Sequence, residues 1–232
     1  MIKVITFDLD DTLWAIAPVI HKANELMLVW MKRHAPKFAQ SYDDQGMAQL
    51  RDEVLANRPD MAHDLSQTRI AFVELGLSRC GYHNAQALSL DAFDVYVAAR
   101  NDVVLFDGTR DQIATLKRSY QIGALTNGNA DLTQVGIGHL FDFHFNSAHI
   151  GVSKPHPDFF ARALAHTGHG ADSFIHVGDN PAHDIAGAQA VGMRTIWMNP
   201  DNNPWPDGYT RACAEIHHLD QLGPAVAQIN GN

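Results

Sequence analysis

Short apolar runs alternate with helical patterns along much of this 232-residue chain. Five runs have the length of a strand and are bounded by Gly, Asn, Asp or Pro, at residues 2–7, 121–126, 143–147, 173–177 and 194–198. Helical patterns separate the later runs, at residues 111–120, 157–167 and 182–191. Parallel strands need a long crossover, usually a helix, so this alternation predicts an α/β fold with a doubly wound, Rossmann-like parallel sheet.

Residues 15–100 interrupt this alternation. They contain no convincing strand, and helical periods follow one another around residues 20–31, 47–55, 70–77 and 88–99. We expect Pro36 and Pro59 to stop the first two helices and the third to end near Gly76. The sequence therefore predicts a core domain of residues 1–14 and 101–232, with a helical cap domain of residues 15–100 inserted after the first strand.

The first apolar run ends in an acidic loop, Asp8-Leu9-Asp10-Asp11-Thr12-Leu13. Neighbouring carboxylates repel one another, and burying one without a partner is unfavourable. A divalent cation with a preference for hard oxygen ligands, such as Mg²⁺, would relieve the repulsion. Because ligands of parallel α/β sheets bind outside the carboxyl ends of the strands, we predict an active-site loop here. A plain acidic turn with Thr12 as a helix cap is the alternative.

Two further loops carry groups that suit a phosphate. Thr126-Asn127-Gly128 follows an apolar run and offers a hydroxyl and a backbone N–H to a phosphoryl oxygen. The same residues could form a hairpin turn, but we expect a helix to follow them. Lys154 lies before Pro155 in a loop that leads into a helix. Its ammonium could neutralise both a carboxylate and a phosphate, although a lone lysine is more often only solvated.

The fourth loop is Gly178-Asp179-Asn180, followed by Asp184. Asp179 is the candidate metal ligand, and Asp184 would orient it or bind the metal through water. Helix capping around Pro181 is the alternative. Taken together, the four loops supply two pairs of carboxylates, a hydroxyl and a lysine, which are the groups needed to transfer a phosphoryl group onto an aspartate.

With these motifs in this order, the chain resembles the haloacid dehalogenase-like hydrolases over nearly its whole length. The motifs that match are Asp8-x-Asp10-x-Thr12, Thr126, Lys154-Pro155, and Gly178-Asp179-Asn180 with Asp184. The helical insertion is similar to the first type of cap in that family, the C1 cap. Residues 7–13, 126–130 and 176–179, with the cap stretch 63–66 and Arg69, look like a bacterial branch of phosphatases of riboflavin biosynthesis and of FMN.

The resemblance implies a Mg²⁺-dependent phosphatase that works through an aspartyl-phosphate. Asp8 would be the nucleophile, and Asp10 would protonate the leaving group and then activate water. Thr126, Asn127 and Lys154 would bind the transferring phosphoryl group.

The resemblance also implies a metal site and substrate contacts. Mg²⁺ would be held by the Asp8 carboxylate, the Asp10 backbone carbonyl and Asp179, with Asp184 as orienting or water-mediated ligand. Candidate substrate contacts are Trp14, His63 and Arg69, the last two in the cap.

Three other functions share this fold. A 2-haloacid dehalogenase attacks carbon and needs neither a metal nor a leaving-group acid, and the presence of Asp10 speaks against it. A phosphomutase shares every core motif, so only substrate tests separate it. A non-catalytic binding module is expected to lose Asp8 or Asp179, and both are present.

Composition narrows the partners. The chain has 17 Lys and Arg against 26 Asp and Glu, a net charge of −9, and no basic run, so we do not expect it to bind nucleic acid. No apolar stretch approaches the ~20 residues of a membrane span, and residues 1–4 lack the layout of a signal peptide. The two cysteines, Cys80 and Cys213, suggest no disulfide framework. We expect a cytoplasmic enzyme, a monomer or homodimer, that acts on a small-molecule phosphate ester.

Overall fold

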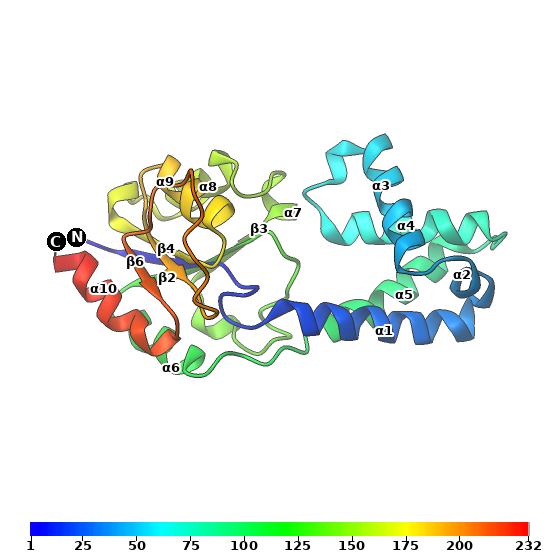
Figure 1. Ribbon diagram of the computed structural model, residues 1–232, viewed down its shortest axis with the longest axis horizontal. Helices are drawn as coiled ribbons and strands as arrows, with labels where there is room; N and C mark the ends of the chain where they lie inside the picture. Colours follow the sequence, from blue (N-terminus) through cyan, green and yellow to red (C-terminus); the bar gives the residue numbers. More distant parts are fainter. Residues whose placement is uncertain (232) are drawn as a thin grey trace. The chain divides into compact units, whose positions relative to one another are not determined.

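The computed structural model describes residues 1–231 and divides into two compact units (Figure 1). The core unit comprises Met1–Ala15 and the chain from Val104 onward, and the helical unit comprises Ile16–Val103. Within the core unit, the two points where the chain leaves and returns are joined. The Phe106 N–H donates to the Leu13 carbonyl at 2.8 Å, and Trp14 pairs with Leu105 in an antiparallel bridge.

The core unit is built on a six-stranded sheet in the order β3-β2-β1-β4-β5-β6, in which every neighbouring pair is parallel. The strands are β1 (Val4–Phe7), β2 (Gln121–Thr126), β3 (Phe143–Asn146), β4 (Phe174–Gly178), β5 (Arg194–Met198) and β6 (Ala214–Ile216). All four residues of β1 are buried, which explains why the strand is mainly apolar, since a central parallel strand is covered on both faces. The predicted α/β fold with a doubly wound parallel sheet is confirmed.

Helices cover both faces of this sheet. They are α6 (Thr109–Lys117), α7 (Ser147–Ile150), α8 (Pro157–Thr167), α9 (Gly187–Ala190) and α10 (Leu222–Gly231). Figure 1 shows α8 and α9 on one face and α6 and α10 on the other. Helix α8 begins at Pro157, buries Phe159, Phe160 and Ala163, and ends at Gly168 in the left-handed conformation.

Two predicted helical segments of the core unit are wrong in detail. The pattern at residues 182–191 is a six-residue π-helical segment, η4 (Pro181–Ala186), followed by the short α9. Such segments occur often at functional sites. After Gly128 the chain forms turns rather than a helix, up to the 3₁₀ segment η2 (Gly138–Leu140). The hairpin alternative fails as well, because β2 and β3 are parallel.

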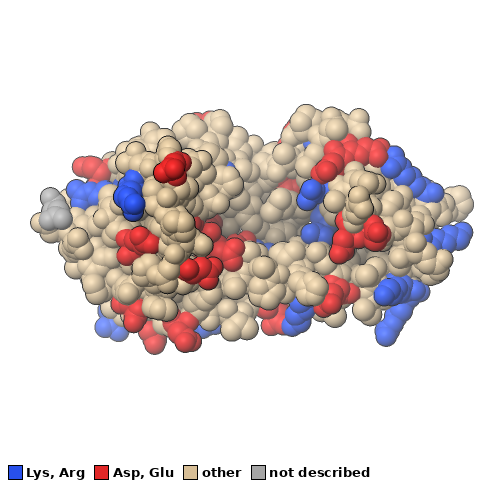
Figure 2. Space-filling view, in the orientation of Figure 1, with Lys and Arg blue, Asp and Glu red and all other residues tan. Residues whose placement is uncertain are grey.

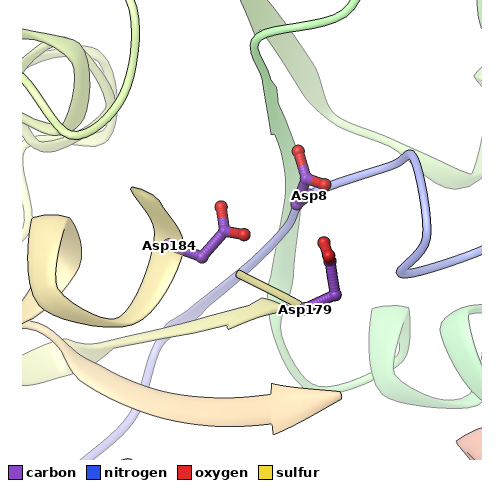
Figure 3. A group of neighbouring side chains, drawn as sticks. All are labelled: Asp8, Asp179 and Asp184. Carbon is purple, nitrogen blue, oxygen red and sulfur yellow. The ribbon is translucent and has the colours of Figure 1, made fainter. Parts of the chain in front are cut away.

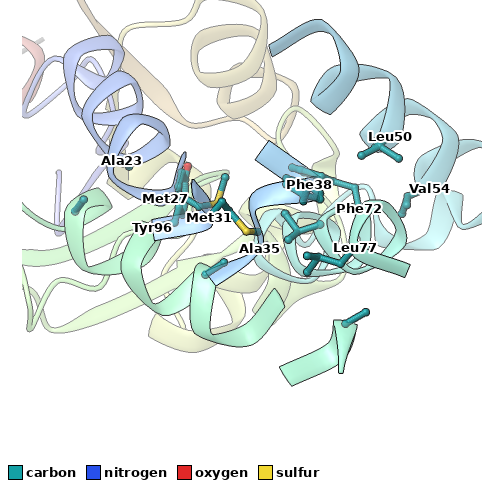
Figure 4. Close-up of a cluster of buried hydrophobic side chains, with 14 residues drawn as sticks. Ala23, Met27, Met31, Ala35, Phe38, Leu50, Val54, Phe72, Leu77 and Tyr96 are labelled. Atoms are coloured by element: carbon teal, nitrogen blue, oxygen red, sulfur yellow. The ribbon is translucent and has the colours of Figure 1, made fainter. Parts of the chain in front are cut away.

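The helical unit has its own hydrophobic core (Figure 4). Its helices are α1 (Ile16–His34), α2 (Pro36–Ser41), α3 (Asp44–Asn57), α4 (Leu65–Arg79) and α5 (Ala85–Arg100), with the 3₁₀ segment η1 (Pro59–Met61). Gly76 does not end α4 as predicted but lies inside it. A Cβ at this position would come within 2.5 Å of Phe38 and 2.8 Å of Leu50, so the glycine allows close packing between helices.

The surface of this chain is charged and mainly acidic. Figure 2 shows several groups of Asp and Glu side chains on the face of the core unit in view. Exposed ion pairs such as Lys22–Asp102 and Arg79–Glu53 lie within the helical unit and are of a kind that contributes little stability.

Among residues 1–231, none of the helices combines the length and the apolar composition that crossing a lipid bilayer requires.

Candidate active site

The four polar loops predicted from the sequence meet at the carboxyl edge of the sheet in the core unit. They enclose a pocket of about 130 Å³. Its lining consists of Asp8, Asp10, Thr126, Asn127, Gly128, Lys154, Asp179, Asn180, His183 and Asp184. Strands β1, β2 and β4 lie side by side, so Asp8 at the end of β1 is brought together with Thr126 and Asp179, which are more than 100 residues away from it in sequence. A pocket of this volume is small compared with sites for whole organic ligands.

Lys154 is the central cation of this pocket. Its side chain is almost completely buried, and its ammonium Nζ donates to Asp8 Oδ1 at 2.6 Å, Asp184 Oδ1 at 2.5 Å and the Leu125 carbonyl at 2.8 Å. An ammonium has three hydrogens, so these three acceptors define its direction. Burial opposes the charge, but the carboxylates of Asp184 and Asp8 hold the pKa of Lys154 above its ordinary value.

Three carboxylates surround this single cation. Oxygens of Asp8, Asp179 and Asp184 lie within 4.8 Å of one another. Figure 3 shows these three side chains close together in the core unit. Burial raises the pKa of Asp8 well above its ordinary value, and Asp184 and Asp179 add repulsion. Burial, with repulsion from Asp184 and Asp11, raises the pKa of Asp179 to about 7. Asp184 is different, because although burial acts to raise its pKa, Lys154 and His176 hold it well below the usual range.

This donor set fits a divalent cation. Lys154 carries one positive charge and can balance only one of the three carboxylates. The raised pKa values of Asp8 and Asp179 agree with a negative charge that is poorly compensated. Hard oxygen ligands in this number suit Mg²⁺ or a similar ion. Asp10 is not part of the carboxylate group; its Oδ1 accepts a hydrogen bond from the Trp14 indole at 2.9 Å. The ligand role predicted for the Asp10 backbone carbonyl stays a prediction.

Gly178 explains how Asp184 reaches the site. A Cβ on Gly178 would lie 2.4 Å from the Asp184 Cβ and Cγ. The Asp184 side chain therefore packs directly over the end of β4, in space that only a glycine leaves open. Its Oδ2 accepts from the Asn180 N–H at 3.0 Å, which closes the η4 segment around the carboxylate.

The acidic loop after β1 is a tight turn. The Leu13 N–H donates to the Leu9 carbonyl, and the Asp11 N–H donates to the Trp14 carbonyl at 2.7 Å. Asp11 adopts a positive φ of 58°, a conformation that Asp tolerates better than most residues. The buried Thr12 hydroxyl donates to Asp179 Oδ1 at 3.2 Å, so this loop also fixes the acidic residue of the fourth motif.

Thr126 and Asn127 have different roles in the structure. Thr126 Oγ1 accepts from the Gly128 N–H at 2.9 Å. The Asn127 side chain instead holds Lys154, since its Oδ1 accepts from the Lys154 N–H at 2.7 Å and its Nδ2 donates to the Lys154 carbonyl at 3.1 Å. These bonds direct the Asn127 side chain to the lysine loop, and the phosphate-binding role predicted for Asn127 stays a prediction.

The substrate-binding roles predicted for Trp14, His63 and Arg69 stay predictions, and the structure describes each residue within its own unit. Trp14 is fully buried in the core unit beside Asp10, so its indole orients that carboxylate rather than presenting an open surface. Arg69, in the helical unit, lies over the Tyr96 ring with 3.6 Å between its Cζ and the ring centroid, and it donates to Asn24 Oδ1 at 3.1 Å. His63 is half-buried and precedes the residue that caps α4.

Three polar residues of the site received no role in the sequence analysis, which named Asn180 and His176 only as parts of matching motifs and did not mention His183. Asn180 and His183 line the pocket, and Asn180 Oδ1 accepts from the N–H groups of Ala182 and His183. Both belong to the loop that carries Asp179, so their place beside that motif was the available signal. His176 is fully buried in β4 and contacts Asp184. A histidine inside an apolar strand was the signal that could have revealed it.

The chain belongs to the haloacid dehalogenase-like hydrolases, whose family model matches residues 2–192. It is 29% identical over 203 residues to the 5-amino-6-(5-phospho-D-ribitylamino)uracil phosphatase YigB of Escherichia coli (strain K12), covering 87% of this chain and 85% of that protein. It is 30% identical over 212 residues to a glyceraldehyde 3-phosphate phosphatase of Pyrococcus abyssi, covering 85% and 82%. The resemblance to this family is thereby confirmed.

A solved structure is also very similar. A crystal structure described as 2-haloacid dehalogenase from Pseudomonas syringae pv. Tomato DC3000 superposes with a TM-score of 0.95 at 36% identity, over 98% of this chain and 99% of that one. The relatives thus include proteins named for phosphate esters and one named for carbon–halogen bonds. The fold agrees with both, so the chemistry has to be argued from the site.

Proposed function

We propose that this chain is a metal-dependent phosphatase that hydrolyses a small-molecule phosphate monoester through an aspartyl-phosphate on Asp8. The observation that supports it best is the group of three carboxylates, Asp8, Asp179 and Asp184, around one buried lysine. The pocket of about 130 Å³ has room for a phosphoryl group but not for a large leaving group. The curated relatives named above as phosphatases support the same class of enzyme.

Four residues of the pocket have defined tasks in the phosphoryl transfer that we propose. Asp8 attacks phosphorus, and the Lys154 ammonium beside it offsets the charge of the incoming phosphate. Because Thr126 Oγ1 accepts from Gly128, its own hydrogen is directed elsewhere, and we assign it to a phosphoryl oxygen. Asp10, held by Trp14, protonates the leaving oxygen and then takes a proton from water.

A bound Mg²⁺ would supply charge stabilisation in the phosphoryl transfer. Asp8, Asp179 and the Asp10 backbone carbonyl would hold it, with Asp184 bound through water or orienting the site. Thr12 fixes Asp179 for this purpose. The cation would compensate the carboxylates whose pKa values burial raises.

Dehalogenation of a 2-haloacid is the second candidate, because the structure described as a dehalogenase is 36% identical to this chain. Asp10 argues for the phosphatase, since dehalogenation needs no acid at this position, and Asp10 is oriented by a part-buried hydrogen bond from Trp14. Phosphate release from an aryl phosphate and chloride release from 2-chloropropionate, measured on the same preparation, decide between the two. Chloride release without phosphate release would overturn the proposal.

Removal of divalent metal should abolish the activity. We expect phosphate release from an aryl phosphate to fall to background in EDTA and to return with Mg²⁺. Beryllium fluoride with Mg²⁺ should raise the melting temperature, because only the folded site binds this phosphoryl mimic. Asp179→Asn should lose this shift, whereas the exposed Asp172→Asn should keep it. Full activity in EDTA, or an unchanged shift in Asp179→Asn, would contradict the metal site.

For the substrate, we propose either FMN or a phosphorylated intermediate of the riboflavin pathway. The sequence similarity to YigB over most of both chains supports this class. A phosphate-release screen over ribityl and flavin phosphates, sugar phosphates including glyceraldehyde 3-phosphate, and nucleotides tests it. No activity on ribityl or flavin phosphates would refute the substrate class while leaving the phosphatase chemistry intact. Transfer of the phosphoryl group to a second hydroxyl of the same substrate, without net release of phosphate, would indicate a phosphomutase instead.

We also propose that the helical unit acts as the cap and that Arg69 recognises the leaving group. Arg69→Ala should raise KM for ribityl or flavin phosphates about 10-fold or more, the effect of losing one hydrogen bond to a charged group. Hydrolysis of a small aryl phosphate should change little. Arg79→Ala is the matched control, because Arg79 lies on the same helix but pairs with Glu53. Equal losses on every substrate would show that Arg69 only packs on Tyr96.

A further inference from the structure

A buried histidine lies directly behind the site and has no task in the mechanism above. His176, in the middle of β4, is 0% exposed. Its Nε2 is 3.2 Å from Asp184 Oδ1, and its Nδ1 is 2.9 Å from the hydroxyl of Thr6. Thr6 is its cross-strand partner on β1, so the parallel register itself places the two side chains together. The Phe160 ring packs edge-on against the imidazole, with 5.3 Å between the ring centroids.

The chemistry of the partners fixes the direction of these bonds. An ionised carboxylate only accepts hydrogen bonds, so Nε2 is the donor to Asp184 whatever the state of the ring. Thr6 then engages Nδ1 from the neighbouring strand, which prevents the ring from flipping. Both strands are central in the sheet, so the imidazole is held between strands that are paired on both sides.

Asp184 Oδ1 receives two donors, His176 Nε2 and the Lys154 ammonium. Its other oxygen, Oδ2, accepts from the Asn180 N–H. The two oxygens are thus divided, one toward the lysine and one toward the η4 backbone. Without the histidine, the carboxylate loses the contact that keeps Oδ1 on the lysine side, and Lys154 loses its defined direction toward Asp8.

We infer that His176 is a positioning residue, which fixes Asp184 so that Asp184 aims the Lys154 ammonium at the nucleophile Asp8. The chain of contacts runs Thr6, His176, Asp184, Lys154, Asp8, and every distance along it is between 2.5 and 3.2 Å. The inference rests on the proposed function of Asp8. It adds a group that touches neither substrate nor metal but sets the geometry of the charge that stabilises the transfer.

A pair of variants separates positioning from packing. His176→Gln carries an amide Nε2 that can reach Asp184, whereas His176→Asn is one methylene shorter and cannot. Both place an amide in the same buried space, so their effect on folding should be similar. We expect kcat to fall about 10- to 100-fold in His176→Asn, the usual cost of losing an outer-shell partner, with KM within about threefold of the parent. His176→Gln should recover kcat to within about fivefold.

A second measurement does not need turnover. In ¹⁵N–¹H spectra of lysine ammonium groups, Lys154 should give a slowly exchanging signal, since all three hydrogens are bonded in a buried site. The signal is assigned by its absence from Lys154→Met. It should persist in His176→Gln and be lost or shifted in His176→Asn. A parent enzyme without phosphatase activity would refute the proposed function, and the spectra would still test the positioning.

Two results would overturn the inference. One is an equal loss of kcat in the Gln and Asn variants, corrected for the folded fraction. The other is a Lys154 ammonium signal that is the same in the parent and in His176→Asn. Either result would mean that the histidine only fills space between β1 and β4.

Discussion

The Asp8→Asn variant is expected to release phosphate on the order of 10⁴-fold more slowly than the parent, or not measurably. The substitution keeps the volume of the side chain and removes the attacking oxygen. The amide also replaces a carboxyl group whose pKa is raised by burial, so the substitution removes a buried negative charge. The fold should therefore persist. Rapid acid quench with radiolabelled substrate should trap phosphate on the parent chain and none on this variant.

Asp10→Asn is the matched comparison, because it makes the same chemical change two residues further along the same loop. It should retain the nucleophile and slow the acid–base steps by ~10²–10⁴-fold. Mass spectrometry of the Asn variants excludes deamidation back to Asp, which would restore activity. Near-normal turnover of an intact Asp8→Asn protein would rule out covalent catalysis by this residue.

Lys154→Met should damage both stability and activity. Its removal leaves Asp8 and Asp184 buried next to each other without the cation that lies between them. Removal of one partner from a buried ion pair typically costs about 3–5 kcal/mol of unfolding free energy. Urea unfolding measures this loss, and phosphate release should fall to background in the same variant, since the charge that offsets the phosphate is gone.

Lys117→Met provides the control for that substitution. Lys117 pairs with Asp142 at 2.8 Å, but both side chains are about one-third exposed. An ion pair of this kind contributes roughly 0–1 kcal/mol. If the two variants lost similar unfolding free energy, the buried ion pairs of Lys154 would contribute no more to stability than an exposed pair.

The strands that hold the site could be predicted because they are buried on both faces and are therefore mainly apolar. Strand β6 could not, because this edge strand is three residues long and pairs on one side only with β5. Helix α2 was missed for a related reason, since its six residues bury a single side chain, Phe38, and show no helical period. Gly76 misled because a glycine needed for close packing looks the same in sequence as one that ends a helix.

The site, too, could be predicted only in part from the sequence. Asp8, Thr126, Lys154 and Asp179 could be predicted to meet, because each follows a strand or precedes a helix at one edge of a parallel sheet. The hydrogen bonds that link these loops could not be predicted. The bonds of Asn127 to the backbone of Lys154, and the bond of Trp14 to Asp10, depend on side-chain directions in loops. The place of His176 depends on the register of β1 against β4, which no local pattern specifies.

The joined exit and return of the chain, where Phe106 bonds to Leu13 and Trp14 pairs with Leu105, has an evolutionary meaning. The ends of the inserted segment are clamped by the core unit itself, so the length and content of the insert impose little strain on the sheet. Selection can then replace the inserted module while the reacting groups stay where they are. Proteins with this arrangement can acquire new substrates while the residues that carry out the reaction stay unchanged.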